Sequence, residues 1–515
     1  MVWTEALGNE ALGAERFGKG HGVVGADAAE SCRAVPRSAS VPGGTLARRD
    51  GAPIFGAMDT RRDSPTPGLR RVFRIRDGLA VSVGIVIGAG ILRTPGDIAG
   101  YLGRSWLILA VWLLGGLVAG LSTLLLSEMA AALPRAGGKY VYAHEAWGPV
   151  AGFVAGWGEV IVARGFSGAA KAVVIAEYLG LLVHGLNVPA AAGAIVVMFV
   201  LLHLAGVQTG RTFQNVTTLV KVIILLVIAA AGVAAGLGVG GAHHAAAPAP
   251  AAGALVPITV LGIALAYQNV AFAYYGWEDA AKMAEETRDP GHALPRILLG
   301  GAAAVAILYL LINVSFLTAL SPAQMAGSKL VAQDAVAGTF GHAAGTVVVV
   351  AGILILLSSL NVNFLATPRV AVALARDGLA PRGFARVGAR GTPGRALVFF
   401  SAVLFALAIT GAFEWILRFM MLVAISIDTM VLLGFFRLRR TRPELARPMR
   451  VPWYPWLPAF AIVLQVLILA AIVGTQPRLA LGGGAMLLIL IVGGLLTAGR
   501  AGEGRRPARV RRPHP

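Results

Sequence analysis

A succession of apolar runs, each close to the length of a membrane-spanning helix, is the feature that most constrains the fold of this chain. A helix needs about 20 apolar residues to cross the hydrocarbon core of a bilayer. From Asp77 onward, runs of this length follow one another almost to the C-terminus. The pattern predicts an all-α polytopic membrane protein with about twelve transmembrane helices. Their expected bounds are residues 77–102, 105–131, 149–179, 188–206, 214–238, 255–283, 296–320, 343–372, 394–412, 414–437, 456–474 and 479–498.

The composition agrees with a membrane protein and excludes an ordinary soluble domain. Apolar residues make up 57% of the chain and charged residues 13%, and the mean hydropathy is +0.74, far from the values of soluble proteins. The formal charge of +19 would suggest nucleic acid in a soluble chain. Here the basic residues lie in loops between the apolar runs and in both tails, so they are interpreted as topology determinants and no nucleic-acid partner is expected.

The distribution of basic residues predicts a protein of the cell membrane with both termini in the cytoplasm. Residues 1–75 show no sustained apolar periodicity and are expected to form a disordered, basic cytoplasmic tail, as are residues 499–515. Met58 is a possible alternative translation start, because it stands shortly before the first run. The basic residues that this orientation places inside include Arg70, Arg71, Arg74, Arg76, Arg135, Lys139, Arg211, Arg288, Arg296 and those within 376–395 and 437–450.

Small residues interrupt the first apolar run at Gly88, Ala89 and Gly90. Glycine holds a helix poorly and lets a ligand approach the backbone, so we expect the helix to break here. The break would leave free N–H groups and the positive end of a half-helix dipole facing an anion such as a carboxylate. Taken alone, these residues are equally compatible with a notch for close helix packing.

A second interruption lies in the sixth run, where Gly276 stands between Tyr274–Tyr275 and Trp277. An interfacial aromatic belt is the less favoured reading, because these residues lie well inside the run. Breaks in the first and sixth helices predict two repeats of five helices, and the odd number inverts the second copy in the membrane. The expected organisation is a transporter core over residues 77–437, made of repeats 77–238 and 255–437, followed by two additional helices over 456–498.

Short motifs stand in order along the runs and the loops between them. They are Gly-Ala-Gly-Ile at 88–91, Ser127-Glu128-Met129, Pro134 to Tyr142, Gln214-Asn215 with Lys221, Phe272 to Trp277, Glu285-Glu286, Asp289-Pro290, Ala375 to Leu379 with Pro381, Arg442-Pro443-Glu444, Arg447-Pro448, Val451-Pro452 and Pro455. With these motifs the chain resembles the amino acid/polyamine/organocation (APC) superfamily, and within it the bacterial relatives of the L-type amino acid transporters. The resemblance covers residues 77–499.

The resemblance implies the leucine-transporter-like fold of five-plus-five inverted repeats, alternating access, and an amino acid held between helices one and six. Backbone N–H groups around the first break would bind the substrate carboxylate, and carbonyls beside both breaks would bind the ammonium. Phe272 would cap the substrate, and Tyr275 would shrink the side-chain pocket. The implied substrate-binding residues are Ile85, Gly88, Ala89, Gly90, Ile91, Phe272, Ala273, Tyr274, Tyr275 and Gly276.

Lys221 lies inside the fifth run, where an ammonium costs a few kcal/mol unless it is paired or faces a polar cavity. In sodium-coupled relatives a cation sits between the first and eighth helices. The resemblance suggests that the Lys221 ammonium takes this place, against carbonyls of the first break and Ser358 or Ser359; snorkelling to the cytoplasmic face is the alternative. Arg93, just after the first break, departs from the family pattern. It would favour a substrate with an acidic side chain or second carboxylate if it reaches the cavity, and otherwise anchors the half-helix at the interface.

Further charged residues fall inside the runs, and most are expected to form structural pairs. Arg164 and Lys171 share a face of the third run and either bind charge on the substrate or pair with the acidic residues of that run; pairing is expected. Asp428 in the tenth run could carry a proton, but is expected to pair with Arg437 or its neighbours. The acidic residues of the third run are Glu159 and Glu177.

The predicted function is secondary active transport of amino acids by alternating access, as an exchanger or with proton coupling, and without sodium. A carrier of polyamines or other organic cations with the same fold is the alternative. A membrane-embedded enzyme is less well supported, because the runs show no cluster of nucleophile, metal ligands or paired acids. A channel is a third, less favoured interpretation that the broken helices alone do not exclude. We expect no cofactor and no metal. Since no cysteine follows Cys32, we also expect no disulfide-linked accessory subunit.

Overall fold

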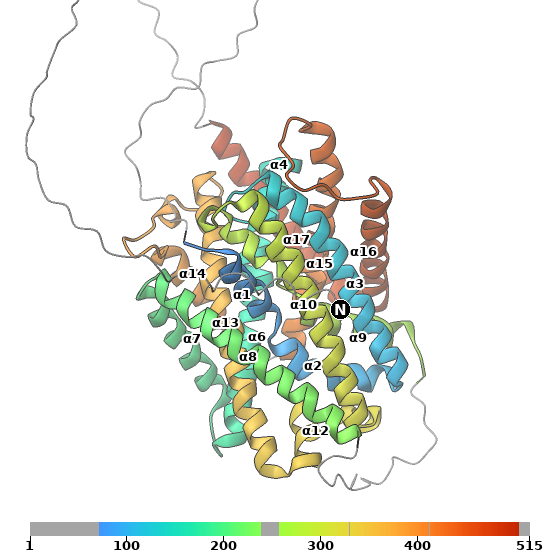
Figure 1. The fold of residues 1–515 in the computed structure, drawn as a ribbon. Helices are drawn as coiled ribbons and strands as arrows, with labels where there is room; N and C mark the ends of the chain where they lie inside the picture. Colours follow the sequence, from blue (N-terminus) through green and yellow to red (C-terminus); the bar gives the residue numbers. More distant parts are fainter. Residues whose placement is uncertain (1–71, 238–256, 329, 411–412, 504–515) are drawn as a thin grey trace, which may run out of the picture. The chain divides into compact units, whose positions relative to one another are not determined.

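The computed structural model describes residues 72–237, 257–328, 330–410 and 413–503 (Figure 1). These residues are almost entirely helical, and their β contact is one isolated bridge between Phe73 and Thr287. The predictions for the N-terminal tail, Met58, Cys32 and most of the C-terminal tail lie outside the described residues.

Long apolar helices dominate the fold and make the chain a multi-pass membrane protein. Within the described ranges, 8 helices or helix pairs are long and apolar enough to cross a bilayer. They are α1 (Ile75–Val86) with α2 (Ala89–Leu102), α3 (Ser105–Ala132), α8 (Val207–Gly236), α10 (Pro290–Ala319), α13 (His342–Arg376), α15 (Phe413–Thr441), α16 (Trp456–Thr475) and α17 (Pro477–Glu503). Two shorter apolar helices are α7 (Val188–Leu204) and α14 (Gly394–Ala408).

The third and sixth expected spans are each built from consecutive pieces. The third is continuous, and runs through α5 (Pro149–Trp157), the π-helical segment η1 (Gly158–Phe166) and α6 (Ser167–Leu182). The sixth consists of α9 (Val260–Tyr274) and the 3₁₀ segment η2 (Trp277–Glu286). Helix irregularities of this kind are common at functional sites.

Short helices between the spans were not anticipated, because elements this short carry no spanning-length apolar signal. They are α4 (Lys139–Trp147), α11 (Pro322–Ala326), α12 (Val331–Phe340) and η3 (Arg382–Ala385). Helices α4 and α12 lie at opposite ends of the helix bundle in Figure 1. These ends are called the α4 end and the α12 end below.

Packing places the two interrupted spans against each other. Helix α2 packs on α9, and α1 packs on α10, α8 and η2. Helix α13 contacts α1, α6 and α8, while α16 and α17 flank α15. The ends of α1, α2, α9 and η2 are thereby brought together inside the bundle.

Candidate functional site

The first span breaks close to the expected place. Helix α1 ends at Val86, Ile87 and Gly88 are not helical, and α2 begins at Ala89. The unwound residues are therefore Ile87 and Gly88, and the prediction that Ala89 and Gly90 are unwound is wrong: they form the first turn of α2. The N–H groups of a first helical turn have no partners within the helix, so Ala89, Gly90 and the following Ile91 still offer donors.

The sixth span breaks at Tyr275 and Gly276, as expected. Helix α9 ends at Tyr274, Tyr275 is extended, and Gly276 has a φ of +119°. This left-handed region is strained for a residue with a side chain, which explains the glycine. A Cβ on Gly276 would also lie 2.9 Å from Ile85 in α1, so the second break faces the first span closely.

Tyr309 of α10 joins the two breaks. Its hydroxyl lies 2.7 Å from the carbonyl oxygen of Val86 and 3.2 Å from that of Ala273, and can donate to either. On the other side, Gly90 lies so close to Ala273 that a Cβ at position 90 would overlap the Ala273 backbone. The predicted residues of the two breaks are therefore neighbours. Sequence reasoning missed Tyr309, because a lone tyrosine in an apolar run carries no distinguishing signal.

Lys221 reaches the first break from α8. Its side chain is buried, with 1% exposure. The ammonium donates hydrogen bonds to the carbonyl oxygens of Gly84 and of Ile87, the latter at 3.1 Å. Because these carbonyls lie at the end of α1, where the helical bonding stops, the ammonium supplies donors that the helix cannot. Snorkelling is not the arrangement seen.

The two serines expected beside Lys221 make other contacts. Ser359 Oγ donates to the Ile85 carbonyl oxygen at 2.8 Å. Ser358 Oγ accepts from Thr217 at 2.8 Å. The expectation of a serine contact to the Lys221 ammonium is therefore wrong within the described residues, although Ser359 does bind the same break.

Phe272 and Arg93 meet a common neighbour, Phe413. The rings of Phe272 and Phe413 are edge to face, with centroids 6.3 Å apart. Arg93 forms an ion pair with Asp97 at 3.3 Å, and its guanidinium lies 5.6 Å from the Phe413 ring centroid. Arg93 is thus held along α2.

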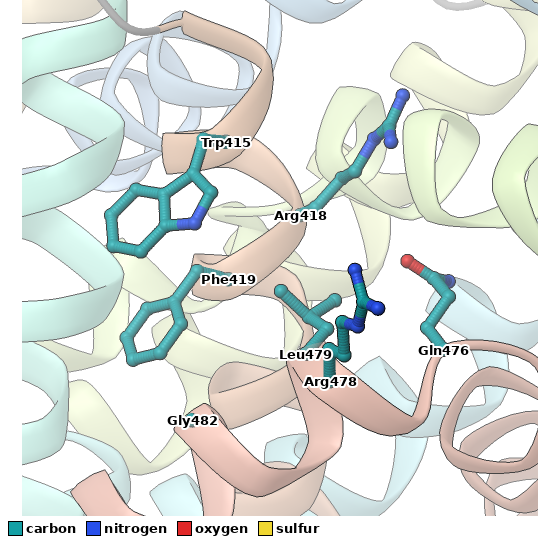
Figure 2. A pocket seen from close by; sticks show the side chains of 7 residues that line it. All are labelled: Trp415, Arg418, Phe419, Gln476, Arg478, Leu479 and Gly482. Atoms are coloured by element: carbon teal, nitrogen blue, oxygen red, sulfur yellow. The ribbon is translucent and has the colours of Figure 1, made fainter.

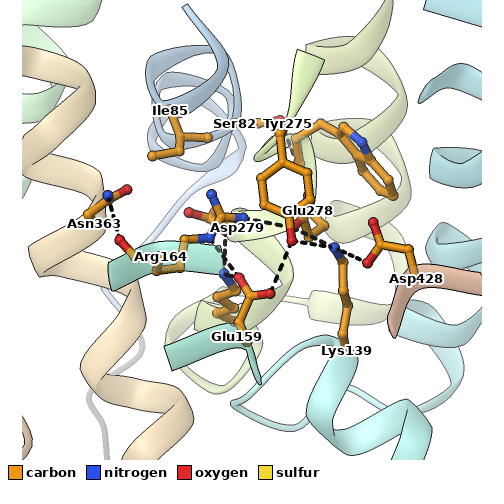
Figure 3. Close-up of polar contacts among 12 residues, drawn as sticks. Ser82, Ile85, Lys139, Glu159, Arg164, Tyr275, Glu278, Asp279, Asn363 and Asp428 are labelled. Atoms are coloured by element: carbon orange, nitrogen blue, oxygen red, sulfur yellow. Dashed lines mark hydrogen bonds and ion pairs between the residues drawn. The ribbon is translucent and has the colours of Figure 1, made fainter. Parts of the chain in front are cut away.

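Acidic and basic side chains joined by ion pairs gather around the second break and are called the charge cluster; Figure 3 labels all of them except Lys282. Arg164 binds Glu159 at 2.6 Å and both Glu278 and Asp279 at 2.7 Å. Lys282 binds Asp279 at 2.5 Å and also Glu159. Buried charges of opposite sign offset the cost of leaving water only when paired this way. The members are Lys139, Glu159, Arg164, Glu278, Asp279, Lys282 and Asp428.

Asp428 belongs to this cluster, so the predicted pairing with Arg437 is wrong. Lys139 of α4 binds Asp428 at 2.6 Å and Glu278 at 2.8 Å. Its ammonium also lies 4.7 Å from the Tyr275 ring centroid. The contact between Lys139 and Asp428 could not be predicted from the apolar runs. The two residues are far apart in the sequence, and helix α4, which carries Lys139, was not anticipated.

Three carboxylates of the cluster come close enough together to resemble a metal site. Ligand atoms of Glu159, Glu278 and Asp279 lie within 4.8 Å of one another. Each carboxylate is already bonded to a cation, through Arg164 or Lys282. The donor set therefore favours an internal ion network over a metal centre, and no residue here is assigned to a cofactor.

Pairing within the third span is confirmed for Glu159 with Arg164 only. Lys171 instead donates to Asn363 Oδ1 at 3.4 Å. Among the residues that the structure describes, Lys171 has no ion pair with Glu177 or with another carboxylate.

Comparison with known proteins identifies the family of this fold. The amino acid permease family matches residues 77–495. The chain belongs to this family. The match covers both breaks, Lys221 and the charge cluster, and confirms the predicted APC-type permease.

Named relatives agree with this assignment. The permease is 26% identical to the b(0,+)-type amino acid transporter 1 of Mus musculus over 423 residues, 80% of this chain and 84% of that protein. It is 27% identical to the serine/threonine exchanger SteT of Bacillus subtilis (strain 168), over 78% of this chain and 91% of that protein. Identity to the Asc-type amino acid transporter 1 of Mus musculus is 27%, over 74% and 73% of the two chains. The permease is therefore an amino acid transporter and not an enzyme.

Polar contacts join neighbouring elements at the α4 end of the permease. Arg369 binds Glu286 at 2.6 Å, and the Phe73 N–H donates to the Glu286 carbonyl oxygen at 2.9 Å. Tyr140 of α4 donates to Asp377 at 2.6 Å. Burial, and then this hydrogen bond, raise the pKa of the Tyr140 phenol. The N-terminal end of α1 and the end of η2 are therefore tied together at this end.

A cavity of about 510 Å³ opens at the other end, where α15 and α17 begin (Figure 2). It contains no residue of the predicted substrate site. Its lining residues are Trp415, Arg418, Phe419, Gln476, Arg478, Leu479 and Gly482. These residues were not predicted as functional, because they come together only through the packing of α15 on α17. This cavity is called the vestibule below.

Proposed function

We propose that this permease is a sodium-independent amino acid carrier that works by alternating access, as an exchanger or with proton coupling. The observation that carries the proposal is the buried Lys221 ammonium bonded to the Gly84 and Ile87 carbonyl oxygens. The Lys221 side chain would stabilise the break from the place that a bound sodium ion would take, by donating to these carbonyl oxygens. The site then needs no sodium to keep its shape.

The proposed architecture is two inverted repeats of five spans, over residues 77–238 and 255–437, with two further helices over 456–498. The position of the breaks supports it: the first span of each proposed repeat is the interrupted one. Paired interruptions at corresponding places are typical of inverted-repeat transporters. The count of about twelve spans follows if α5 to α6 and α9 to η2 cross the bilayer together with the long and short apolar helices.

The substrate is proposed to bind between the two breaks. Its carboxylate would accept hydrogen bonds from the N–H groups of Gly88, Ala89 and Gly90, where the dipole of α2 also favours negative charge. Carbonyl oxygens near Ile85 and from Phe272 to Tyr275 would accept from its ammonium. Phe272, packed on Phe413, would then exclude water from the charged ends of the substrate.

The proposed location is the cell membrane, with both termini and α4 on the cytoplasmic side. The concentration of arginine and lysine in the loops on the side of α4 supports this orientation. The contacts of Arg369, Glu286 and Phe73 would then form the closed cytoplasmic side of the carrier. No disulfide-linked accessory subunit is proposed.

Counterflow in proteoliposomes tests the proposal. Vesicles loaded with one unlabelled amino acid should take up labelled amino acid in a saturable way, at the same rate in sodium and in choline buffer, and a pH step would separate exchange from proton coupling. Uptake that requires sodium, or no counterflow with any common amino acid, would contradict it.

Replacement of the internal cation tests the role of Lys221. Lys221→Met should reduce counterflow by about tenfold or more, because the carbonyls of the first break lose their donors. The matched control is Leu219→Met on the same helix, whose side chain is 65% exposed. The melting temperature of each purified variant separates loss of folding from loss of transport. Wild-type counterflow in Lys221→Met would remove this residue from the mechanism.

A further inference from the structure

Lys171 is a buried lysine that forms no ion pair with a carboxylate of the described protein. Its side chain is 4% exposed, and its hydrogen bond within the described ranges goes to the neutral Asn363 at 3.4 Å. The buried cations Lys139, Arg164 and Lys282 each bind at least one carboxylate closely. Because an unpaired charge inside a membrane protein is costly, such a residue indicates a functional site.

Contacts through α13 connect Lys171 to the region of the proposed substrate site. Its partner Asn363 also donates to the Arg164 carbonyl oxygen at 3.3 Å. Asn363 stands one helical turn after Ser359, whose hydroxyl binds the Ile85 carbonyl oxygen at the end of α1. Figure 3 shows the contact between Asn363 and Arg164, with Ile85 of α1 drawn in the same region. Lys171 thus contacts the same helix whose Ser359 binds the first break.

Arg164 offers a second donor in the same region. Its Nη1 is buried and has no hydrogen-bond partner among the described residues, although its Nε and Nη2 are bound by carboxylates. A Cβ built on Gly276 would lie 3.2 Å from this Nη1 and 2.9 Å from Ile85. The unpaired N–H groups of Arg164 therefore lie at the second break, close to where it faces the first span.

The vestibule at the α12 end carries positive charge, and two of its residues contact helices of the proposed site. Arg418 and Arg478 both line it (Figure 2). Its Phe419 stacks on Phe166, with centroids 5.6 Å apart, and Phe166 precedes Lys171 by little more than one helical turn. Its Gln476 donates to Gln268, one turn before Phe272, at 2.8 Å. A cavity lined by charges of one sign concentrates ligands of the opposite sign.

We propose that the permease carries amino acids with an acidic side chain, and that the Lys171 ammonium binds the side-chain carboxylate. Arg164 Nη1 is the second donor to that carboxylate, while the N–H groups at the start of α2 hold the α-carboxylate. The substrate carboxylate supplies the ion pair that Lys171 lacks. This inference rests on the proposed function, because it names the substrate class of the same site.

Competition between glutamate and glutamine tests the substrate class without any variant. The two molecules have nearly the same shape and differ by one charge, so shape alone cannot separate them. Glutamate or aspartate should show a kcat/KM in counterflow that exceeds that of glutamine or asparagine by about tenfold or more, as for a site built to pair a polar group. Preference for the neutral amino acids would overturn this inference and leave the amino acid carrier intact, whereas no exchange of any amino acid would overturn the proposed function itself.

Two variants assign the selectivity to Lys171. Lys171→Met should lower the glutamate-to-glutamine ratio of kcat/KM by about tenfold or more, and Lys171→Arg should keep glutamate as the preferred substrate. If Lys171 were merely structural, its replacement would lower kcat/KM for both substrates equally. An unchanged glutamate-to-glutamine ratio of kcat/KM in Lys171→Met would therefore overturn the assignment. If Lys171→Met does not fold, protection of the wild-type protein against thermal unfolding decides: glutamate should raise the melting temperature more than glutamine does, and equal or reversed shifts overturn the proposal.

Discussion

The ion pair between Arg369 and Glu286 allows a quantitative test of how the α4 end is held closed. Both side chains are almost completely buried, at 3% and 2% exposure, and two guanidinium nitrogens bind two carboxylate oxygens at 2.6 and 3.3 Å. At an effective dielectric constant of about 20, two unit charges about 4 Å apart attract each other by about 4 kcal/mol. Much of this attraction offsets the cost of removing both charges from water.

The structure therefore predicts that removing one partner of this ion pair lowers the free energy of unfolding by much more than removing both partners. Arg369→Met should lower the free energy of unfolding by about 3–5 kcal/mol, because it leaves the Glu286 carboxylate buried without a counterion. The double variant with Glu286→Leu should recover most of this loss, because neither charge then remains buried. Arg376→Met is the matched control: its pair with Glu285 joins the same two elements at 2.8 Å but is 36% and 30% exposed. That control should cost about 0–1 kcal/mol.

Denaturant titration of the purified permease in detergent micelles, followed by tryptophan fluorescence, measures these differences. The reasoning is refuted if Arg369→Met costs no more than Arg376→Met. It is also refuted if the double variant is as unstable as the sum of the two single variants, since the cost would then not arise from an unpaired charge.

Two further predictions concern backbone contact and pH. Gly90→Ala should destabilise the permease by about 1–3 kcal/mol and impair counterflow, because the new Cβ overlaps the Ala273 backbone. The control Gly120→Ala has open space around its new Cβ and should leave stability and counterflow unchanged or slightly improved. Equal melting temperatures and counterflow rates for the two alanine variants would contradict this interpretation. The phenol of Tyr140 has a pKa raised by burial and by its bond to Asp377; a raised folded-state pKa means that its contribution is present below about pH 10 and lost as the pH rises further. Tyr140→Phe should accordingly make the fall in unfolding free energy above about pH 10 less steep, and identical slopes in both proteins would argue against it.

The membrane-spanning helices could be predicted because their signal is local. The bounds of α3, α13, α16 and α17 lie within a few residues of the apolar runs, apart from the C-terminal end of α17, since a bilayer requires a minimum apolar length wherever the helix later packs. Short elements such as α4 escaped prediction, because a helix of 9 residues at the membrane surface needs neither that length nor that composition.

Ion partners escaped prediction for a different reason. Asp428 has Arg437 nearby in sequence but binds Lys139, which approaches from α4 far away along the chain. Similarly, Lys171 was expected to pair within its own span, whereas it faces Asn363. Charge pairing in a bundle depends on which helices become neighbours, and sequence distance carries little of that information.

The two breaks separate what the sequence determines from what the tertiary structure decides. Glycine at 88 and 276 allows the first and sixth spans to unwind, because Gly276 has a positive φ and a Cβ on Gly88 would lie 2.5 Å from Ser359 Oγ. Only the folded bundle decides that Tyr309 joins the carbonyls of the two breaks, that Lys221 lies at the end of α1, and that Lys171 forms no ion pair within the described protein. The physical reason is that backbone propensity is encoded residue by residue, whereas burial and charge balance arise only when distant helices pack together.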